Sequence, residues 1–339
     1  MVILTSPKSR EFAKKVYDSL VRVSGKDYNS VPFTTIDIDY FNNKEIGVQI
    51  PENLRKRDVY FIHTFSNDSE YEPNIALMEL YLVDDAIRRA SANEITYILP
   101  HIPYQRQDRK DKPRVPLSAR RIMDMLTVYP TPQTRIVTFD MHAGQIQGFS
   151  HYPVDNLEAL PLFLDYFKNN GFSDPAKVTV VSPDVGGTRR ARDFANRLGN
   201  GLAIIDKSRV PRSEAEVMNV IGDVNDVAII IDDLVDSGGT LIKGANLLRE
   251  RGAKDVYACC THAVLSPSMD KEEGRITPAE EKFVKSGIKM VATDTIPRTE
   301  KYLEDNKTWL DILSVADMTG DAVHRIQTGK SVSELFKTY

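Results

Sequence analysis

The chain has 339 residues, of which 41% are hydrophobic and 27% are charged, an ordinary composition for a soluble globular protein. Its net charge of −4 gives no general reason to expect binding to nucleic acid or to a membrane. No apolar run approaches the roughly 18 residues of a membrane span, and the first apolar run is too short for a signal peptide. These features predict a cytoplasmic protein. Cys259 and Cys260 are neighbours in a strand-like run, where side chains alternate between faces, so we expect core packing and no disulfide between them.

Short apolar runs alternate with helical stretches along most of the chain, which predicts an α/β fold with mostly parallel sheets. The predicted strands are residues 2–4, 59–62, 96–99, 136–139, 178–181, 202–205, 228–231, 256–261 and 290–293. The clearest predicted helices are residues 73–92, 118–127, 159–169 and 188–198. Because nine strands exceed one doubly wound unit, and the length favours about two domains, we expect a boundary near residues 155–160.

The first informative loop, DYFNNKEIGVQI at residues 39–50, combines an aromatic and two polar side chains. Phe41 is suited to stacking on a planar base, and Asn43 and Glu45 to hydrogen bonds with its edge. On this loop alone, a plain hairpin turn is the simpler interpretation.

A basic loop, HIPYQRQDRKDKPRVPLS at residues 101–118, follows a predicted strand, where α/β sheets bind ligands. Arginine is suited to bidentate contact with phosphate. The alternative is a solvated run of surface charge. The basic residues are Arg106, Arg109, Lys110, Lys112 and Arg114.

Two further strand ends carry residues suited to a metal ion. In TFDMHAGQIQ, His142 precedes a turn of small residues and could bind a divalent metal or a phosphate-bound water, although a lone histidine is more often structural. In VTVVSPDVGGTRR, Asp184 precedes a glycine pair at the expected C-terminal end of a strand. Carboxylates beside phosphate oxygens are the usual setting for Mg²⁺.

The stretch DKSRVPR at residues 206–212 follows another predicted strand and is rich in positive charge. A mobile basic arm of this kind could close over a polyphosphate and neutralise charge as it develops. An ordinary polar hairpin is the alternative. Lys207 and Arg209 are the candidate catalytic residues.

The stretch VAIIIDDLVDSGGT at residues 227–240 predicts a buried strand, an acidic loop, a glycine-rich turn and the start of a helix. The helical spacing after the glycines places Leu241, Ala245 and Leu248 on one face. Backbone N–H groups at a helix N-terminus bind phosphate, and Gly238 and Gly239 allow close approach. Asp232 and Asp233 suit sugar hydroxyls, or a metal ion placed between them and another phosphate. The sequence therefore predicts a sugar-phosphate site.

Taken together, these segments resemble one family. DDLVDSGGT resembles the phosphoribosyl-diphosphate loop shared by type I phosphoribosyltransferases and ribose-phosphate diphosphokinases. The segments PYQRQDRKDKPRVPLSAR, TFDMHAGQIQGF, YPVDNL, VVSPDVGGTRRAR, AIIDKSR and DTIP resemble class I ribose-phosphate diphosphokinase, in the right order. The resemblance implies two phosphoribosyltransferase-like domains. They would cover residues 1–157 and 158–317, with the tail at about 318–339 packing back on the first.

The resemblance also implies an activity, in which the β,γ-diphosphoryl group of ATP moves to the anomeric hydroxyl of ribose 5-phosphate, and Mg²⁺ takes part. The nucleotide would be held by Phe41, Asn43, Glu45, Arg106, Gln107 and Asp111. His142 and Asp184 would help to hold Mg²⁺–ATP, and Lys207 and Arg209 match the family's catalytic arm.

Ribose 5-phosphate would occupy the glycine-rich stretch. Asp232 and Asp233 would serve its hydroxyls and a second cation. The 5-phosphate would lie in the loop formed by Asp236, Ser237, Gly238, Gly239 and Thr240. The family favours a homo-oligomer, a hexamer built from dimers.

The sequence also departs from the family pattern. Lys44 replaces a usual glycine before Glu45, so any turn with positive φ there would be strained. The first strand is followed by LTSPKSREF, and the segments before Phe41 and at residues 266–289 are longer than usual. Phosphate activation, ADP inhibition and assembly are therefore the features least transferable from the family.

Two rival functions remain open on the sequence. One is a phosphoribosyltransferase, against which the basic loop and the Lys207 and Arg209 pair argue. The other is a non-catalytic regulatory paralogue that only assembles with an active enzyme, although the catalytic segments are present.

Overall fold

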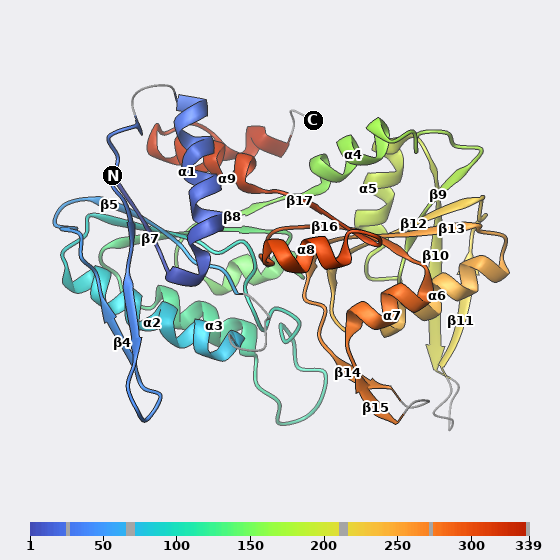
Figure 1. Ribbon diagram of the computed structural model, residues 1–339, viewed down its shortest axis with the longest axis horizontal. Coiled ribbons are helices and arrows are strands. Elements are labelled where there is room, and N and C mark those ends of the chain that lie inside the picture. The colour runs from blue at the N-terminus through green and yellow to red at the C-terminus, as the bar shows by residue number, and fades with distance from the viewer. Residues whose placement is uncertain (25–27, 66–71, 210–215, 271–273, 337–339) are drawn as a thin grey trace. The chain divides into compact units, whose positions relative to one another are not determined.

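The computed structural model describes residues 1–24, 28–65, 72–209, 216–270 and 274–336, with the backbone alone at 207–209, 216–217 and 336. The chain folds into two compact units (Figure 1). Unit 1 comprises Met1–Glu158, Thr295–Pro297 and Ser314–Tyr339, and unit 2 comprises Ala159–Asp294 and Arg298–Leu313.

Unit 1 contains a six-stranded sheet in the order β2-β1-β5-β6-β7-β8, in which every neighbouring pair is parallel. Figure 1 shows α2 and α3 on one face of this sheet and α1 and α9 on the other. A separate hairpin, β3–β4, is antiparallel. The strands are β1 (Val2–Thr5), β2 (Phe33–Thr35), β3 (Asp37–Tyr40), β4 (Ile46–Gln49), β5 (Asp58–Ile62), β6 (Glu94–Ile98), β7 (Gln133–Phe139) and β8 (Val154–Leu157). The helices are α1 (Arg10–Ser24), α2 (Pro73–Arg89), α3 (Ser118–Thr127) and α9 (Ala316–Gln327), with short 3₁₀ turns η1 (Pro7–Ser9), η3 (Gly144–Phe149) and η4 (Val332–Phe336).

The core of unit 1 follows from side-chain alternation along the strands. Val59 and Phe61, two residues apart on β5, point to the same face and pack in one cluster with Leu80 and Val83 of α2. Leu80 and Val83 of α2 lie three positions apart and therefore share the helix face that packs against these strand residues. On the other side of the sheet, α1 packs against α9, so helices from the two ends of the sequence lie together in unit 1.

Unit 2 contains a seven-stranded sheet in the order β11-β10-β9-β12-β13-β16-β17, parallel except for the antiparallel pair β10–β11. A small hairpin, β14–β15, precedes α7. The strands are β9 (Val178–Ser182), β10 (Gly201–Arg209), β11 (Glu216–Ile221), β12 (Val227–Val235), β13 (Asp255–Ala263), β14 (Ser268–Asp270), β15 (Arg275–Thr277), β16 (Lys289–Thr293) and β17 (Leu310–Leu313). The helices are α4 (Leu160–Asn169), α5 (Thr188–Leu198), α6 (Gly239–Glu250), α7 (Ala279–Ser286) and α8 (Glu300–Asn306).

The two cysteines mark the two faces of the unit 2 sheet. Cys259 packs in the cluster that includes Phe167 of α4, whereas Cys260 packs in the cluster that includes Leu248 of α6. Both are free and buried, as predicted. Burial raises the pKa of the Cys260 thiol, so the thiol stays protonated at neutral pH.

All nine predicted strands are present, and the predicted helices at 118–127 and 188–198 coincide with α3 and α5. The strands that the sequence missed lie at sheet edges or in hairpins, where a strand needs no long apolar run. They are β2, β3, β4, β8, β11, β14, β15 and β17.

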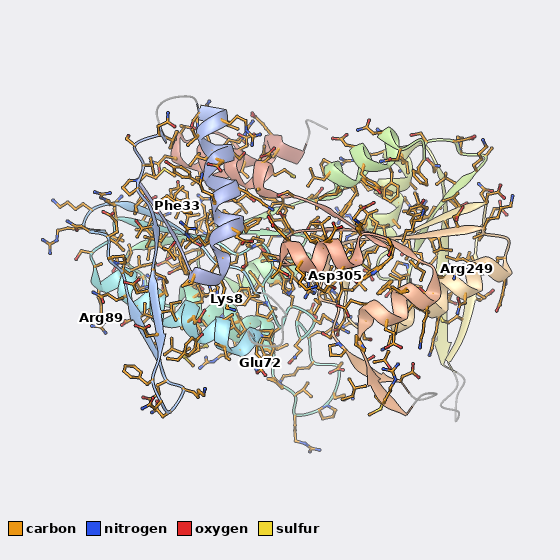
Figure 2. All side chains as sticks on the ribbon, in the orientation of Figure 1. Lys8, Phe33, Glu72, Arg89, Arg249 and Asp305 are labelled. Carbon is orange, nitrogen blue, oxygen red and sulfur yellow. The ribbon has the colours of Figure 1, made fainter. Side chains whose placement is uncertain are left out.

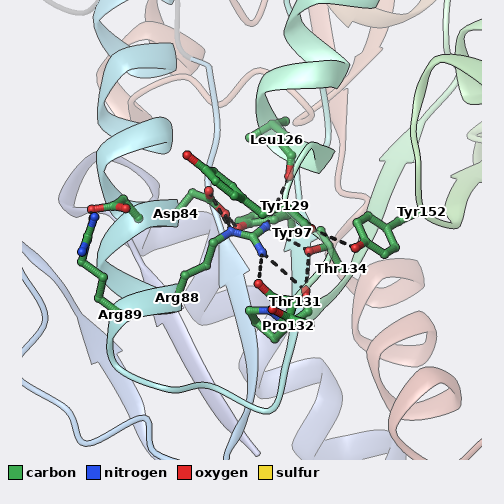
Figure 3. Close-up of polar contacts among 11 residues, drawn as sticks. Asp84, Arg88, Arg89, Tyr97, Leu126, Tyr129, Thr131, Pro132, Thr134 and Tyr152 are labelled. Atoms are coloured by element: carbon green, nitrogen blue, oxygen red, sulfur yellow. Dashed lines mark hydrogen bonds and ion pairs between the residues drawn. The ribbon is translucent and has the colours of Figure 1, made fainter.

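A buried polar network lies where α2 meets β6 and β7 in unit 1 (Figure 3). The Nε of Arg88 donates to both oxygens of Asp84, at 2.8 and 3.0 Å, and the hydroxyl of Tyr97 also donates to Asp84. A second guanidinium nitrogen of Arg88 donates to Thr134 Oγ1 at 3.0 Å and to the Leu126 carbonyl at 3.4 Å. Burial raises the pKa of Asp84, although Arg88 and Tyr97 oppose that rise. The network therefore compensates a charge that would otherwise be costly inside the unit.

The outer faces of the helices carry exposed ion pairs. Figure 2 labels Arg89 on α2, which pairs with Asp85 at 2.7 Å, and Asp305 on α8, which pairs with Lys301 at 2.6 Å. Such pairs contribute little to stability because water screens them. In the described ranges, no helix combines the length and the apolar character that crossing a membrane requires.

Candidate functional site

The acidic pair of unit 2 lies within a strand that extends past one of its neighbours. The sequence predicted a strand ending at residue 231, but β12 continues to Val235 because it keeps pairing with β13 as far as Ala263. On its other side, pairing with β9 ends at Ile230. Asp232 and Asp233 therefore lie in the part of β12 that is paired with β13 but no longer with β9, where Asp232 is partly exposed and Asp233 is buried.

Arg190, from the first turns of α5, contacts both carboxylates. Its Nη1 lies 2.8 Å from Oδ1 of Asp233 and 3.7 Å from Oδ1 of Asp232. The backbone N–H of Asp233 also donates to Asp232 Oδ1 at 2.9 Å. Burial, together with the negative charge of Asp233, raises the pKa of Asp232 to about 7, and Arg190 opposes that rise. The site thus holds a carboxylate that changes charge near neutral pH.

The glycine-rich loop follows directly and ends at the N-terminus of α6. Gly238 has φ of 74°, a left-handed conformation that favours glycine, and α6 begins at Gly239. A Cβ at Gly238 would lie 2.7 Å from a ring carbon of Phe283, so no larger residue fits without displacing that ring. Leu241, Ala245 and Leu248 are buried on one face of α6, as their spacing predicted. The loop's N–H groups and the helix dipole favour an anion at this point.

The turn between β9 and α5 places Asp184 two residues after the strand end. Asp184 is exposed, its Oδ1 accepts the Gly187 N–H at 2.9 Å, and its carbonyl accepts the Ser182 hydroxyl at 2.6 Å. The carboxylate therefore fixes the turn that starts α5. That helix also carries Arg190, so the placement of Arg190 beside the acidic pair depends on this turn.

Lys207 and Arg209 belong to a longer strand than predicted. The predicted strand at 202–205 continues as β10 to Arg209, and the backbone of Lys207 pairs with Met218 of β11. The predicted end of the strand at residue 205 is therefore too early, because antiparallel pairing with β11 extends the strand to Arg209. The side chains of Lys207 and Arg209 lie outside the described part of the chain.

In unit 1, the 41–45 segment is the turn of the β3–β4 hairpin. Phe41 is 61% exposed, and its ring lies over Gly47, where a Cβ would be 3.3 Å away. Asn43 Oδ1 accepts the Glu45 N–H at 3.1 Å. Lys44 has φ of 71°, so this lysine does occupy the left-handed turn position that glycine would fill more easily.

The basic loop of unit 1 is tied to the segment that carries His142. The buried Gln105 accepts the backbone N–H of His142 at 2.9 Å through Oε1, and Gln145 donates to Asp108 at 2.8 Å. His142 itself is exposed. These two hydrogen bonds join residues far apart in sequence and fix the position of His142 relative to the loop.

The remaining predicted nucleotide residues lie on the same loop. Gln107 accepts the Ser118 hydroxyl at 2.6 Å, and its carbonyl accepts the Ala119 N–H at 3.2 Å, so it helps to start α3. Arg106 and Asp111 are exposed.

Within unit 2, the structure brings together Asp232, Asp233 and the 236–240 loop, and adds Arg190, which the sequence reasoning did not select. The signal for Arg190 was present in the TRRAR run after the glycine pair, but three arginines there could not be told apart by spacing. Gln105 was missed because its role is a hydrogen bond to the distant backbone N–H of His142, which the sequence around it does not indicate.

Comparisons with known proteins agree with this arrangement. A family model described as the N-terminal domain of ribose phosphate pyrophosphokinase matches residues 1–129, and one described as a phosphoribosyl synthetase-associated domain matches residues 207–337. Ribose-phosphate pyrophosphokinase from Fusobacterium nucleatum is 42% identical over 337 residues, covering 98% of this chain and 97% of that protein. The Clostridium tetani ribose-phosphate pyrophosphokinase is 42% identical over 341 residues, covering 99% of this chain and 100% of that protein.

A solved structure extends the match to three dimensions. The crystal structure of phosphoribosylpyrophosphate synthetase from Mycobacterium smegmatis has a TM-score of 0.81 and 34% sequence identity, covering 97% of this chain and 100% of that chain. The predicted α/β fold class, with mostly parallel sheets flanked by helices, is confirmed. By full-length similarity in sequence and in structure, this chain belongs to the ribose-phosphate pyrophosphokinase family.

Proposed function

We propose that this protein transfers the β,γ-diphosphoryl group of ATP to the 1-hydroxyl of ribose 5-phosphate, giving 5-phosphoribosyl 1-diphosphate and AMP. The observation that carries the proposal is the joining, at one end of β12, of an acidic strand to a glycine-rich helix N-terminus in a chain of this family. A sugar phosphate needs acceptors for its hydroxyls at one end and N–H donors for its phosphate at the other, and the two groups of the site lie side by side. In the reaction, the sugar oxygen bonds to the β-phosphorus, the bond from that phosphorus to the α-phosphate oxygen breaks, and the hydroxyl proton is released.

The acceptor would be held by the loop and the strand end of unit 2. N–H groups of Ser237, Gly238, Gly239 and Thr240 would bind the 5-phosphate, with Asp236 at the loop entrance. Asp232 and Asp233 would accept hydrogen bonds from the ribose hydroxyls, and Arg190 would hold the two carboxylates in place. This arrangement orients the sugar before the reaction, which is where much of the catalysis of phosphoryl transfer arises.

The donor roles fall largely on unit 1. We assign adenine to Phe41, Asn43 and Glu45, because the exposed ring offers a stacking surface beside polar groups. Arg106, Gln107 and Asp111 would contact the remainder of the nucleotide. Lys207 and Arg209 would neutralise the charge that develops during transfer and on departing AMP.

Mg²⁺ fits the side chains assigned to it. This ion usually binds through one or two carboxylates together with substrate phosphates and water. Among the described residues, no group of three or more His, Cys, Asp or Glu side chains could hold a metal ion without a substrate. Asp184 and His142 are exposed and would contact Mg²⁺–ATP, and Asp232 and Asp233 a second cation. When bound, the ion would withdraw charge from the phosphate oxygens.

Incubation with ATP, Mg²⁺ and ribose 5-phosphate tests the proposal. We expect AMP and 5-phosphoribosyl 1-diphosphate in equal amounts on anion-exchange chromatography. Binding of ribose 5-phosphate without formation of AMP would instead indicate a non-catalytic paralogue. Consumption of 5-phosphoribosyl 1-diphosphate with a nucleobase would indicate a phosphoribosyltransferase.

Assembly and regulation are separate parts of the proposal. We expect a homo-oligomer, with a hexamer built from dimers favoured, and light scattering measures its mass directly. Repeating the AMP assay across phosphate and ADP concentrations tests whether phosphate activates and ADP inhibits. A monomeric mass for the active enzyme would contradict the expected assembly.

A further inference from the structure

Two stacked aromatic side chains lie beneath the glycine-rich loop of unit 2, and one of them approaches Gly238. Phe283 of α7 and Trp309, just before β17, lie with ring centroids 5.0 Å apart and planes 7° from parallel. Phe283 is fully buried and Trp309 almost so. They belong to the same cluster as Val235 and Leu241, the apolar residues on either side of the loop. The stack and the residues that flank the loop therefore share one hydrophobic core.

The closest approach is at Gly238 itself. A Cβ there would lie 2.7 Å from Cε2 and 3.0 Å from Cζ of Phe283, but 3.6 Å from Cδ2, an ordinary contact distance. The outer edge of the phenyl ring thus meets the backbone at the residue whose φ of 74° sets the loop's shape. Any displacement of that ring removes the support under Gly238.

The second ring is anchored from several directions. The indole Nε1 of Trp309 donates to Asn306 Oδ1 at 3.0 Å, and the Trp309 carbonyl accepts the Met290 N–H of β16 at 2.6 Å. Trp309 is therefore fixed to the sheet, and Phe283 stacks on Trp309 with its face while its edge meets Gly238. On α7, Ala279 and Phe283 are the buried residues and lie four positions apart, so one face of this short helix carries the contact.

We propose that Phe283, backed by Trp309, is a positioning residue that holds Gly238 and its neighbours in the phosphate-binding conformation, and that Trp309 reports phosphate binding. Neither side chain touches substrate. Their effect passes through the backbone of the loop, so it concerns the affinity for the phosphate and not the transfer step. This inference rests on the proposed function only in naming ribose 5-phosphate as the ligand.

The chain supplies its own spectroscopic probe, because Trp309 is its only tryptophan. Titration of the full-length protein with ribose 5-phosphate should produce a saturable change in tryptophan emission as the loop tightens on the stack. The same change should appear in Lys207→Ala, where transfer is slow. Inorganic phosphate should produce it at higher concentration, since it lacks the sugar.

Phe283→Leu removes the outer ring atoms and keeps an atom near the Cδ2 position. We expect the KM for ribose 5-phosphate to rise about tenfold while kcat changes less than twofold. Phe167→Leu is the matched control, since Phe167 is equally buried but packs on the other face of the sheet. It should lower stability to a similar degree and leave KM unchanged. Trp309→Phe retains a ring for stacking and should have a smaller effect on KM than Phe283→Leu.

A double-mutant cycle isolates the contact between Gly238 and Phe283. Gly238→Ala should weaken phosphate binding more in the wild type than in Phe283→Leu, because leucine lacks the two atoms that a Cβ would meet. Equal losses in both backgrounds would overturn the proposal. A wild-type KM for ribose 5-phosphate in Phe283→Leu would also overturn the proposal. The same holds for an active enzyme whose tryptophan emission does not change at saturating ribose 5-phosphate. A saturable emission change in a protein that forms no AMP would instead support this inference and refute the proposed reaction.

Discussion

The guanidinium of Arg190 lies 2.8 Å from Oδ1 of Asp233, across 43 positions of sequence, and places a positive charge beside the acidic residues of β12. The side chain of Asp233 is only 7% exposed, so this ion pair offsets part of the cost of burying its charge. The turn held by Asp184 starts the helix that carries Arg190. The geometry of the acceptor site is therefore set from α5 as well as from β12.

Replacement of Arg190 should weaken acceptor binding. Arg190→Gln removes the charge that lowers the pKa of Asp232, so more of this carboxyl is protonated at pH 7. We expect the KM for ribose 5-phosphate to rise about tenfold, which corresponds to about 1.4 kcal/mol, with a larger ratio at pH 6.5 than at pH 8.5. Arg190→Lys keeps the charge and should lose less. Steady-state kinetics at three pH values measures the effect, and a pH-independent loss would contradict the charge argument.

Asp232 should make stability fall as pH rises. Its pKa is raised from 3.8 to about 7 by burial and by Asp233, so the folded protein retains a proton that the unfolded chain releases. Stability from this group is full below about pH 4 and is lost as pH rises toward 7. Asp232→Asn removes the titration, so it should raise the melting temperature by about 3 °C at pH 8 and change it little at pH 4.

Differential scanning calorimetry of Asp232→Asn at pH 4, 6 and 8 measures this difference. Asp226→Asn is the control, because Asp226 lies on the surface in an ion pair with Lys254. A gain for Asp232→Asn that is equal at all three pH values would contradict the assigned pKa.

Arg88 and Arg89 are adjacent on α2 and provide a matched pair for stability. The Arg88–Asp84 pair has side chains 8% and 5% exposed, whereas those of Arg89–Asp85 are 79% and 53% exposed. Arg88→Met should cost about 3–5 kcal/mol because it leaves the buried Asp84 without its cationic partner, although the Tyr97 hydroxyl still donates to it. Arg89→Met should change stability little, because water screens the exposed pair. Urea unfolding followed by circular dichroism measures the free energy of unfolding of both variants. Equal losses in Arg88→Met and Arg89→Met would contradict the expectation that the buried pair matters more.

Lys207 is expected to act on the transfer step. Lys207→Ala should lower kcat at least about 100-fold while the KM for ribose 5-phosphate stays within about threefold, since the charge is needed mainly as the transition state forms. Steady-state measurement of AMP release checks this. A variant with near wild-type turnover would remove Lys207 from the catalytic role.

The sequence predicted those features that depend on local pattern. Apolar runs correctly marked nine strands, and the spacing of Leu241, Ala245 and Leu248 correctly marked the buried face of α6. Lys44 was identified as a residue that would occupy a glycine-like turn, and it does so. These features follow from backbone preferences and periodicity, which a sequence displays directly.

Features that depend on tertiary contacts were missed. Asp232 and Asp233 lie inside β12, because that strand keeps its partner on one side after losing it on the other. The contact of Phe283 with Gly238 depends on packing between segments far apart in the chain. Edge strands such as β8 and β17 were missed because pairing with one neighbour, and not apolar content, defines them.

The central claim is that a diphosphoryl group moves as one piece, and isotope tracking tests it most directly. ATP labelled with ³²P at the γ-position should place all of the transferred label in 5-phosphoribosyl 1-diphosphate, whereas ATP labelled at the α-position should leave its label in AMP. The two products should form in equal amounts and only when ribose 5-phosphate is present. Release of ADP with a singly phosphorylated sugar, or of labelled inorganic phosphate, would contradict the account.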